Sequence, residues 1–112
     1  MSKYRNVRQK YDGRTWDSKK ELAYYIALKE QLKQGKIKDL IIQPEFVLMQ
    51  GYRNKFTGKK IRDIRYRADF QFYDVEQGRT RLVDTKGFST EIFKIKAKLF
   101  GSVYPDIELE LA

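Results

Sequence analysis

Three side chains in the second half of the chain have the types that hydrolysis of a phosphate ester requires. They are Asp69, Asp84 and Lys86, the last two within the run Asp-Thr-Lys. Two carboxylates supply the hard oxygen ligands that Mg²⁺ prefers, and its other coordination positions remain for water and phosphate oxygens. A neighbouring lysine could position or deprotonate the attacking water and stabilise developing charge. These residue types predict a metal-dependent site if folding brings them together.

A hairpin is the element that would bring them together. If Gln77-Gly78 is a two-residue loop, Asp69 stands opposite Lys86, and Gln71 stands opposite Asp84. Opposed residues of an antiparallel pair share a face, so we expect the two aspartates and the lysine on one side. The other face then receives Phe70, Phe72, Val83 and Thr85. A register shift of one residue would break this agreement.

The same pattern has a simpler interpretation, a cross-strand salt bridge between Asp69 and Lys86 on a solvated face. The apolar surroundings weigh against it. Leu82-Val83 immediately precedes Asp84, and helices are expected before and after the hairpin. Two acids in a sheet that helices could cover would be costly unless they have a function.

Glu21 is a third candidate acid. The run Ser18 to Glu21 is a capping-box sequence, in which Glu21 would bond back to the Ser18 amide. Glu21 also lies on a helical stripe with Tyr25, Leu28 and Leu32, so it is expected to face inward. Both a capping role and a direct catalytic role therefore stay open.

The composition narrows the chemistry. The 112 residues contain no cysteine and no histidine, which excludes disulfides, thiolate zinc sites and imidazole catalysis. The net charge of +9 favours polyanionic partners, nucleic acid first. The basic start is followed by no apolar signal region and no stretch is long enough to span a membrane, so we expect a soluble cytoplasmic protein.

The expected elements follow the order α-β-β-β-α-β in a single domain, residues 1–112, with residues 1–14 as an N-terminal arm. The first helix runs from Ser18 towards Gly35, and a β-rich segment interrupted by Pro44 follows. The next elements are a basic loop at 51–60, a strand at 64–73 with Tyr66, Ala68, Phe70 and Phe72 on one face, and a strand at 80–86. The second helix carries a stripe of Ile92, Ile95, Leu99 and Val103, before a last strand at 107–111.

Basic residues near these elements could contact nucleic acid. The candidates are Lys19, Lys20, Arg53, Lys55, Lys59, Lys60, Lys94 and Lys98. On the second helix, Lys94 and Lys98 share a face and could bind phosphates, although a solvated lysine face is an equally simple explanation. The basic loop, which also contains aromatic residues, is either a DNA-contacting flap or a surface loop.

At these residues the chain resembles the restriction-endonuclease-like PD-(D/E)XK superfamily, and within it small phage-encoded endonucleases grouped with Holliday junction resolvases. The resemblance covers residues 4 to 111. It rests on residues 16–21, Ile42-Gln43-Pro44, Tyr66-Arg67-Ala68-Asp69-Phe70 and Val83-Asp84-Thr85-Lys86-Gly87. Ala68 stands where the superfamily's name has proline.

The resemblance implies an α/β fold with a mixed sheet and an αβββαβ core. It implies that Asp69, Asp84 and the backbone carbonyl of Thr85 bind Mg²⁺, for which Mn²⁺ could substitute. Lys86 would be the motif lysine, and Glu21 an acid from the first helix. The expected activity is hydrolysis of DNA phosphodiesters, selective for Holliday junctions or other branched DNA, in phage recombination or replication within a bacterial host.

Symmetric cutting of a junction would require a homodimer. Two alternatives stay open at this point. One is a non-catalytic nucleic-acid-binding module, and the other is the nuclease subunit of a larger recombination or transposition complex.

Overall fold

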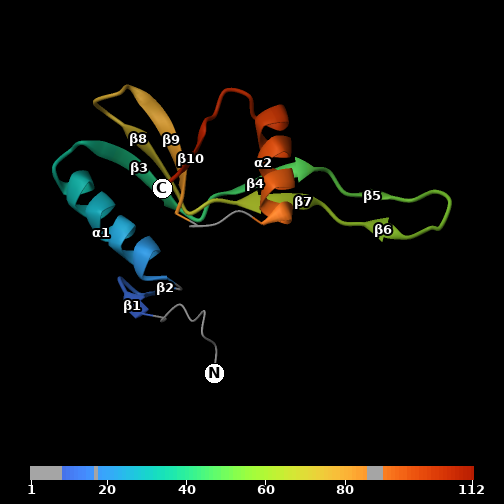
Figure 1. Cartoon of the computed structure of the whole chain (residues 1–112), viewed down its shortest axis with the longest axis horizontal. Helices are drawn as coiled ribbons and strands as arrows, with labels where there is room; N and C mark the ends of the chain where they lie inside the picture. Colours follow the sequence, from blue (N-terminus) through green and yellow to red (C-terminus); the bar gives the residue numbers. More distant parts are fainter. Residues whose placement is uncertain (1–8, 17, 86–89) are drawn as a thin grey trace.

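The computed structural model describes residues 9–16, 18–85 and 90–112. The fold is a mixed α+β arrangement with two helices and several small sheets (Figure 1). The helices are α1 (Lys19–Lys33) and α2 (Glu91–Val103). The strands are β1 (Gln9–Tyr11), β2 (Arg14–Trp16), β3 (Ile37–Ile42), β4 (Glu45–Met49), β5 (Tyr52–Arg53), β6 (Lys60–Ile61), β7 (Ile64–Arg67), β8 (Phe70–Asp74), β9 (Arg79–Asp84) and β10 (Leu109–Leu111).

A long two-stranded ribbon runs through the molecule. It consists of three nested antiparallel pairs, β3 with β8, β4 with β7, and β5 with β6. Near its middle Pro44 interrupts the first strand, as expected, and the expected single strand at 64–73 is also divided there into β7 and β8. We call the outer half, from β4 to β7, the arm; α2 packs against β4 and β7, whereas β5 and β6 extend away from the rest of the protein (Figure 1). The segment predicted as a basic loop therefore contains two short paired strands.

The inner half of the ribbon belongs to a four-stranded sheet with the order β10-β9-β8-β3. β10 runs parallel to β9, whereas the other pairs are antiparallel. Without the strands of the arm and the first hairpin, the chain order is α1, β3, β8, β9, α2, β10.

The register of the β8–β9 hairpin differs from the prediction by two residues. Gln71 pairs with Leu82 rather than with Asp84, and the loop spans residues 75–78 instead of Gln77-Gly78 alone. Asp74 stabilises the longer loop, because its carboxylate accepts a hydrogen bond from the amide of Gln77. Since side chains alternate with a period of two, a shift of two residues leaves the face assignments unchanged. Phe70, Phe72 and Val83 accordingly share one face, as expected.

Helix α1 covers that face. Ser18 caps the helix by accepting a hydrogen bond from the amide of Glu21, and Tyr25 and Leu28 are buried against the sheet. Leu32, which the sequence pattern also placed on the buried stripe, is exposed. Leu32 is the second-last residue of α1, which ends at Lys33.

Helix α2 buries mainly a different face from the one predicted. Of the predicted stripe, Leu99 packs against the core, but Ile92, Ile95 and Val103 are exposed, while Phe100 is buried. Phe100 packs with Leu82 of the sheet and with residues of β4 and β7, in a second hydrophobic core. A pattern of aliphatic residues at helical spacing does not reveal which of two apolar faces is covered, and the aromatic face, which buries the larger area, is the one that packs.

Part of the predicted N-terminal arm, residues 1–14, overlaps a short hairpin. From Gln9 onward it forms the β1–β2 hairpin, whose Trp16 is buried and stacks on Tyr25. Residues 1–8 lie outside the described part of the chain. Within the described residues, no helix combines the length and the apolar character needed to cross a membrane.

We predict that the two apolar faces of α2 differ sharply in their contribution to stability. Phe100 is 1% exposed, so Phe100→Ala should lower the free energy of unfolding by about 3–5 kcal/mol. Ile95 is 57% exposed, so the matched variant Ile95→Ala should stay within about 0.5 kcal/mol of wild type. Urea unfolding followed by circular dichroism measures both. Equal losses in the two variants would contradict the assignment of the buried face.

Candidate functional site

Asp69 and Thr85 meet where two neighbouring strands end. Asp69 directly precedes β8 and Thr85 directly follows β9. Both the backbone amide and the hydroxyl of Thr85 donate hydrogen bonds to Oδ2 of Asp69, at 2.7 and 2.8 Å. The hairpin prediction placed these two residues on opposite faces, and that prediction was wrong. Both lie just outside the regular strands, where strict alternation no longer applies.

Asp84, the last residue of β9, is fully buried. Its Oδ2 accepts a hydrogen bond of 2.5 Å from the hydroxyl of Tyr66 in β7. Burial of the phenol, and then this bond to the Asp84 carboxylate, raise the pKa of Tyr66 far above its ordinary value. Tyr66 is therefore a neutral hydrogen-bond donor at any physiological pH, and it holds the Asp84 side chain in place.

The two aspartates act on a common neighbour. The negative charge of Asp69 also contributes to the raised pKa of Tyr66, after the contributions of burial and of Asp84. Asp69 and Asp84 both have almost no exposed surface. Two buried carboxylates, one phenol and one threonine thus lie together at the edge of the four-stranded sheet, where the ribbon passes from the β3–β8 pair to the β4–β7 pair.

A bend in the ribbon at Gln43 and Pro44 brings these side chains together. Gln43 has a positive φ of 56°, which is rare for a residue other than glycine, and Pro44 follows it. The amide of Gln43 donates to the carbonyl of Asp69 at 2.8 Å, and the amide of Ala68 donates to the carbonyl of Pro44 at 3.1 Å. These bonds hold the backbone of Asp69 directly beside a strained residue, and such strain is concentrated at functional sites.

Tyr66 is a site residue that the sequence pattern missed. Simple alternation placed it on one face with Phe70 and Phe72. Instead, Tyr66 and Ala68 pack in the second core with Leu82 and α2, whereas Phe70 and Phe72 pack in the first core against α1. The bend between β7 and β8 changes the direction of the chain, so a pattern that assumes one continuous strand cannot find it.

Glu21 was expected to face inward at the start of the first helix, and it does. It is buried in the first turn of α1. However, the described residues contain no cluster of three acidic side chains close enough to hold a metal ion. A role for Glu21 as a third metal ligand therefore stays a prediction. Lys86, the lysine of the predicted site, lies outside the described residues.

A cleft of about 500 Å³ lies beside Tyr66, between β7 and the first turn of α2. Its apolar wall includes Ile92 and Phe93. Its lining also contains three cationic side chains that were not among the sequence candidates, namely Arg65, Arg67 and Lys96. No residue pattern in the sequence marks them, because they come from two elements that meet only in the folded chain.

The basic residues predicted to contact nucleic acid fall on three separate elements. Lys19 and Lys20 are exposed at the start of α1, where the Lys20 ammonium donates to the backbone oxygen of Ala112. Lys94 and Lys98 are exposed on α2, and Lys94 forms an ion pair with Glu91 at 3.6 Å. The remaining four belong to the arm, and they are Arg53, Lys55, Lys59 and Lys60.

Comparison with known proteins gives one finding. A family model described as DUF1064, a protein of unknown function, matches residues 1–112. No curated protein and no solved structure matches the chain. Because the family model spans the full 112 residues, the chain belongs to the DUF1064 family.

Proposed function

We propose that this protein is a Mg²⁺-dependent endonuclease that hydrolyses phosphodiester bonds in DNA. The observation that supports it most is the pair of buried aspartates, Asp69 and Asp84, at the base of a basic arm. Burying two carboxylates in a small domain is costly, and evolution retains such groups mainly where they act. A net charge of +9 draws a polyanionic substrate to them.

The donor set suits Mg²⁺. This ion commonly binds through one or two carboxylates and keeps waters and substrate phosphates as its other ligands, so the lack of a third clustered acid among the described residues is no obstacle. Asp69 and Asp84 would hold the ion, with the Thr85 carbonyl and Glu21 as further candidates. When bound, Mg²⁺ would polarise the scissile phosphate and lower the pKa of a coordinated water. Mn²⁺ has the same preference for oxygen ligands and should substitute.

The chain's own residues would orient the metal-binding carboxylates and bind the phosphates of the substrate. Thr85 fixes Oδ2 of Asp69, and Tyr66 fixes Oδ2 of Asp84, so neither carboxylate has to be ordered when substrate arrives. Arg67 and Lys96 line the adjacent cleft, where they would contact the phosphates that flank the cleaved bond. The motif position of Lys86 assigns it to the attacking water.

The element order α1, β3, β8, β9, α2, β10 supports a restriction-endonuclease-like core, because it places the acids at the same points of the αβββαβ order. From the same likeness we propose selectivity for branched DNA, action as a homodimer, and a setting in phage recombination or replication in the bacterial cytoplasm.

We predict that Asp84→Asn reduces Mg²⁺-dependent cleavage of DNA by more than about 100-fold, since even the groups that orient metal ligands are worth about 10- to 100-fold. Asp69→Asn and Lys86→Ala should act in the same direction. DNA binding without divalent metal should stay within about threefold of wild type, because the basic surface is unchanged. Gel assays of cleavage and fluorescence anisotropy of binding measure the two properties.

Asp74→Asn is the matched control. Asp74 is a further buried aspartate in the same hairpin, but it lies at the other end of β8 and is paired with Arg81 at 3.1 Å. This variant should lower stability and leave the cleavage rate of the folded protein unchanged. Equal cleavage by wild type and by Asp84→Asn would overturn the proposed function.

We further predict that Tyr66→Phe weakens activity by about 10- to 100-fold while the protein stays folded. The substitution removes only the hydroxyl that donates to Asp84, so the aromatic packing against α2 is kept. The loss should appear as a higher Mg²⁺ concentration at half-maximal rate, measured by titrating the metal at saturating DNA. An unchanged Mg²⁺ dependence would show that Tyr66 does not position Asp84 for metal binding.

A further inference from the structure

The outer part of the arm, residues 50–63, carries an unusual charge pattern; we call it the β5–β6 hairpin. Between Gln50 and Arg62 the sequence contains five basic residues and no acidic residue. Among the described residues, no carboxylate forms an ion pair with Arg53, Lys55, Lys59, Lys60 or Arg62. The five side chains are exposed, and within the hairpin only the charge of Lys60 acts on the Asp63 carboxylate, without a direct ion pair.

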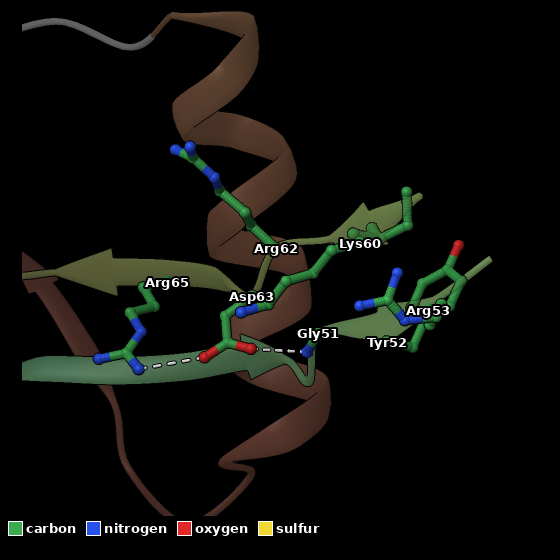
Figure 2. Close-up of a pocket in the computed structure, with 8 residues that line it drawn as sticks. Gly51, Tyr52, Arg53, Lys60, Arg62, Asp63 and Arg65 are labelled. Atoms are coloured by element: carbon green, nitrogen blue, oxygen red, sulfur yellow. Dashed lines mark hydrogen bonds and ion pairs between the residues drawn. The ribbon is translucent and has the colours of Figure 1, made fainter. Parts of the chain in front are cut away.

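The single acid of this hairpin, Asp63, lies at its base, where it holds the two strands together. Asp63 accepts a hydrogen bond from the amide of Gly51 at 2.6 Å and pairs with Arg65 at 3.0 Å (Figure 2). The Gly51 bond first, and then Arg65, hold the pKa of the Asp63 carboxyl below its ordinary value. The strands cross so closely that a Cβ on Gly51 would lie 2.7 Å from the carbonyl oxygen of Ile61. In Figure 2 the Arg62 side chain extends away from this carboxylate, beside a hollow of about 640 Å³.

The tip of the hairpin is held in one conformation by its own hydrogen bonds. The side-chain oxygen of Asn54 accepts from the amides of Phe56 and Thr57, at 2.8 and 3.0 Å. The carbonyl of Asn54 accepts from the amide of Gly58, and the guanidinium of Arg53 donates to the carbonyl of Gly58. A turn with this many internal bonds presents its side chains with little further loss of entropy on binding.

Phe56 is the residue that this turn presents. It is 88% exposed, the highest value among the exposed large hydrophobic residues. It makes no ring contact with another described aromatic residue, and the ammonium of Lys55 lies 5.9 Å from its ring centroid. A single exposed apolar residue is ordinary on a protein surface. At the tip of a cationic hairpin whose single acid lies at its base, however, it is placed to meet the π-face of a base.

We propose that the β5–β6 hairpin recognises branched DNA, with Phe56 stacking on a base exposed at the branch point while the flanking cations bind the backbone. This deepens the proposed function and rests on it. In a continuous duplex each base is covered by its neighbours, whereas a branch leaves a terminal base face open. A two-stranded ribbon also fits the major groove of B-form DNA. The major groove of A-form RNA is too deep and narrow to admit it.

Binding is measured without divalent metal, so that cleavage does not interfere. The probes are a three-way DNA junction with 2-aminopurine at the branch and a linear duplex of the same length. Phe56→Ala should weaken junction binding by about 5- to 100-fold and leave duplex binding within about twofold, since stacking on one base is worth that range. The double variant Lys59→Ala, Lys60→Ala should weaken both probes and reduce the salt slope by about 0.9 per lysine.

Two further substitutions separate ring stacking from general hydrophobicity. Phe56→Trp should keep junction affinity, and its fluorescence should be quenched by the junction but not by the duplex. The chain's own single tryptophan, Trp16, is buried and gives a constant background. Phe56→Leu keeps an apolar side chain without a ring, and it should behave like Phe56→Ala.

Equal loss of affinity for junction and duplex in Phe56→Ala, or no loss for either, would overturn the inference. So would an effect of Phe56→Ala confined to the oligomeric state in sedimentation, which would assign the tip to a contact between copies. Failure of the proposed nuclease function can be distinguished from failure of this inference. If the chain does not cleave DNA, its binding to the junction can still depend on Phe56.

Discussion

The bend at Gln43-Pro44 is the constraint on which the rest of the structure depends. Proline has no N–H and a fixed φ, so a regular ladder cannot pass through it unchanged. The bonds from Gln43 to Asp69 and from Ala68 to Pro44 keep the two strands paired across the bend. The ribbon therefore changes direction without losing its partner. Its inner half packs against α1 and its outer half against α2, which creates two small cores instead of one.

Buried acids lie at both ends of the β8–β9 hairpin. At the loop end, Asp74 is paired with Arg81, which also binds Glu110 at 2.7 Å. Hydrogen bonds and the arginine charge lower the pKa of both carboxyls, as expected of a structural ion network. At the bend, Thr85 donates two hydrogen bonds to Asp69, and Tyr66 donates one to Asp84. Donors of this kind fix the orientation of a carboxylate, which a metal ligand requires.

Sequence patterns predicted features that depend on local periodicity. The capping residue Ser18, the two helices, the interruption at Pro44 and the shared face of Phe70 and Phe72 were all predicted correctly. The predicted register of the β8–β9 hairpin was wrong by two residues. The Asp74 side chain stabilises a longer turn, which dipeptide preferences do not reveal. The shared face of Phe70, Phe72 and Val83 was still predicted correctly, because a shift of two residues preserves the alternation of side chains.

By itself, the sequence determined which groups can do chemistry here: carboxylates, lysines and hydroxyls, in a basic chain without histidine or cysteine. It also determined that Asp69 and Asp84 lie on two neighbouring segments of one hairpin. Only the tertiary structure decided that Tyr66 meets Asp84, that Arg67 and Lys96 line one cleft, and that α2 buries Phe100 instead of Ile95. Each of these depends on the direction the chain takes after a bend or on which of two apolar faces finds a partner. Periodicity in one segment cannot encode that choice, because the partner lies in another segment.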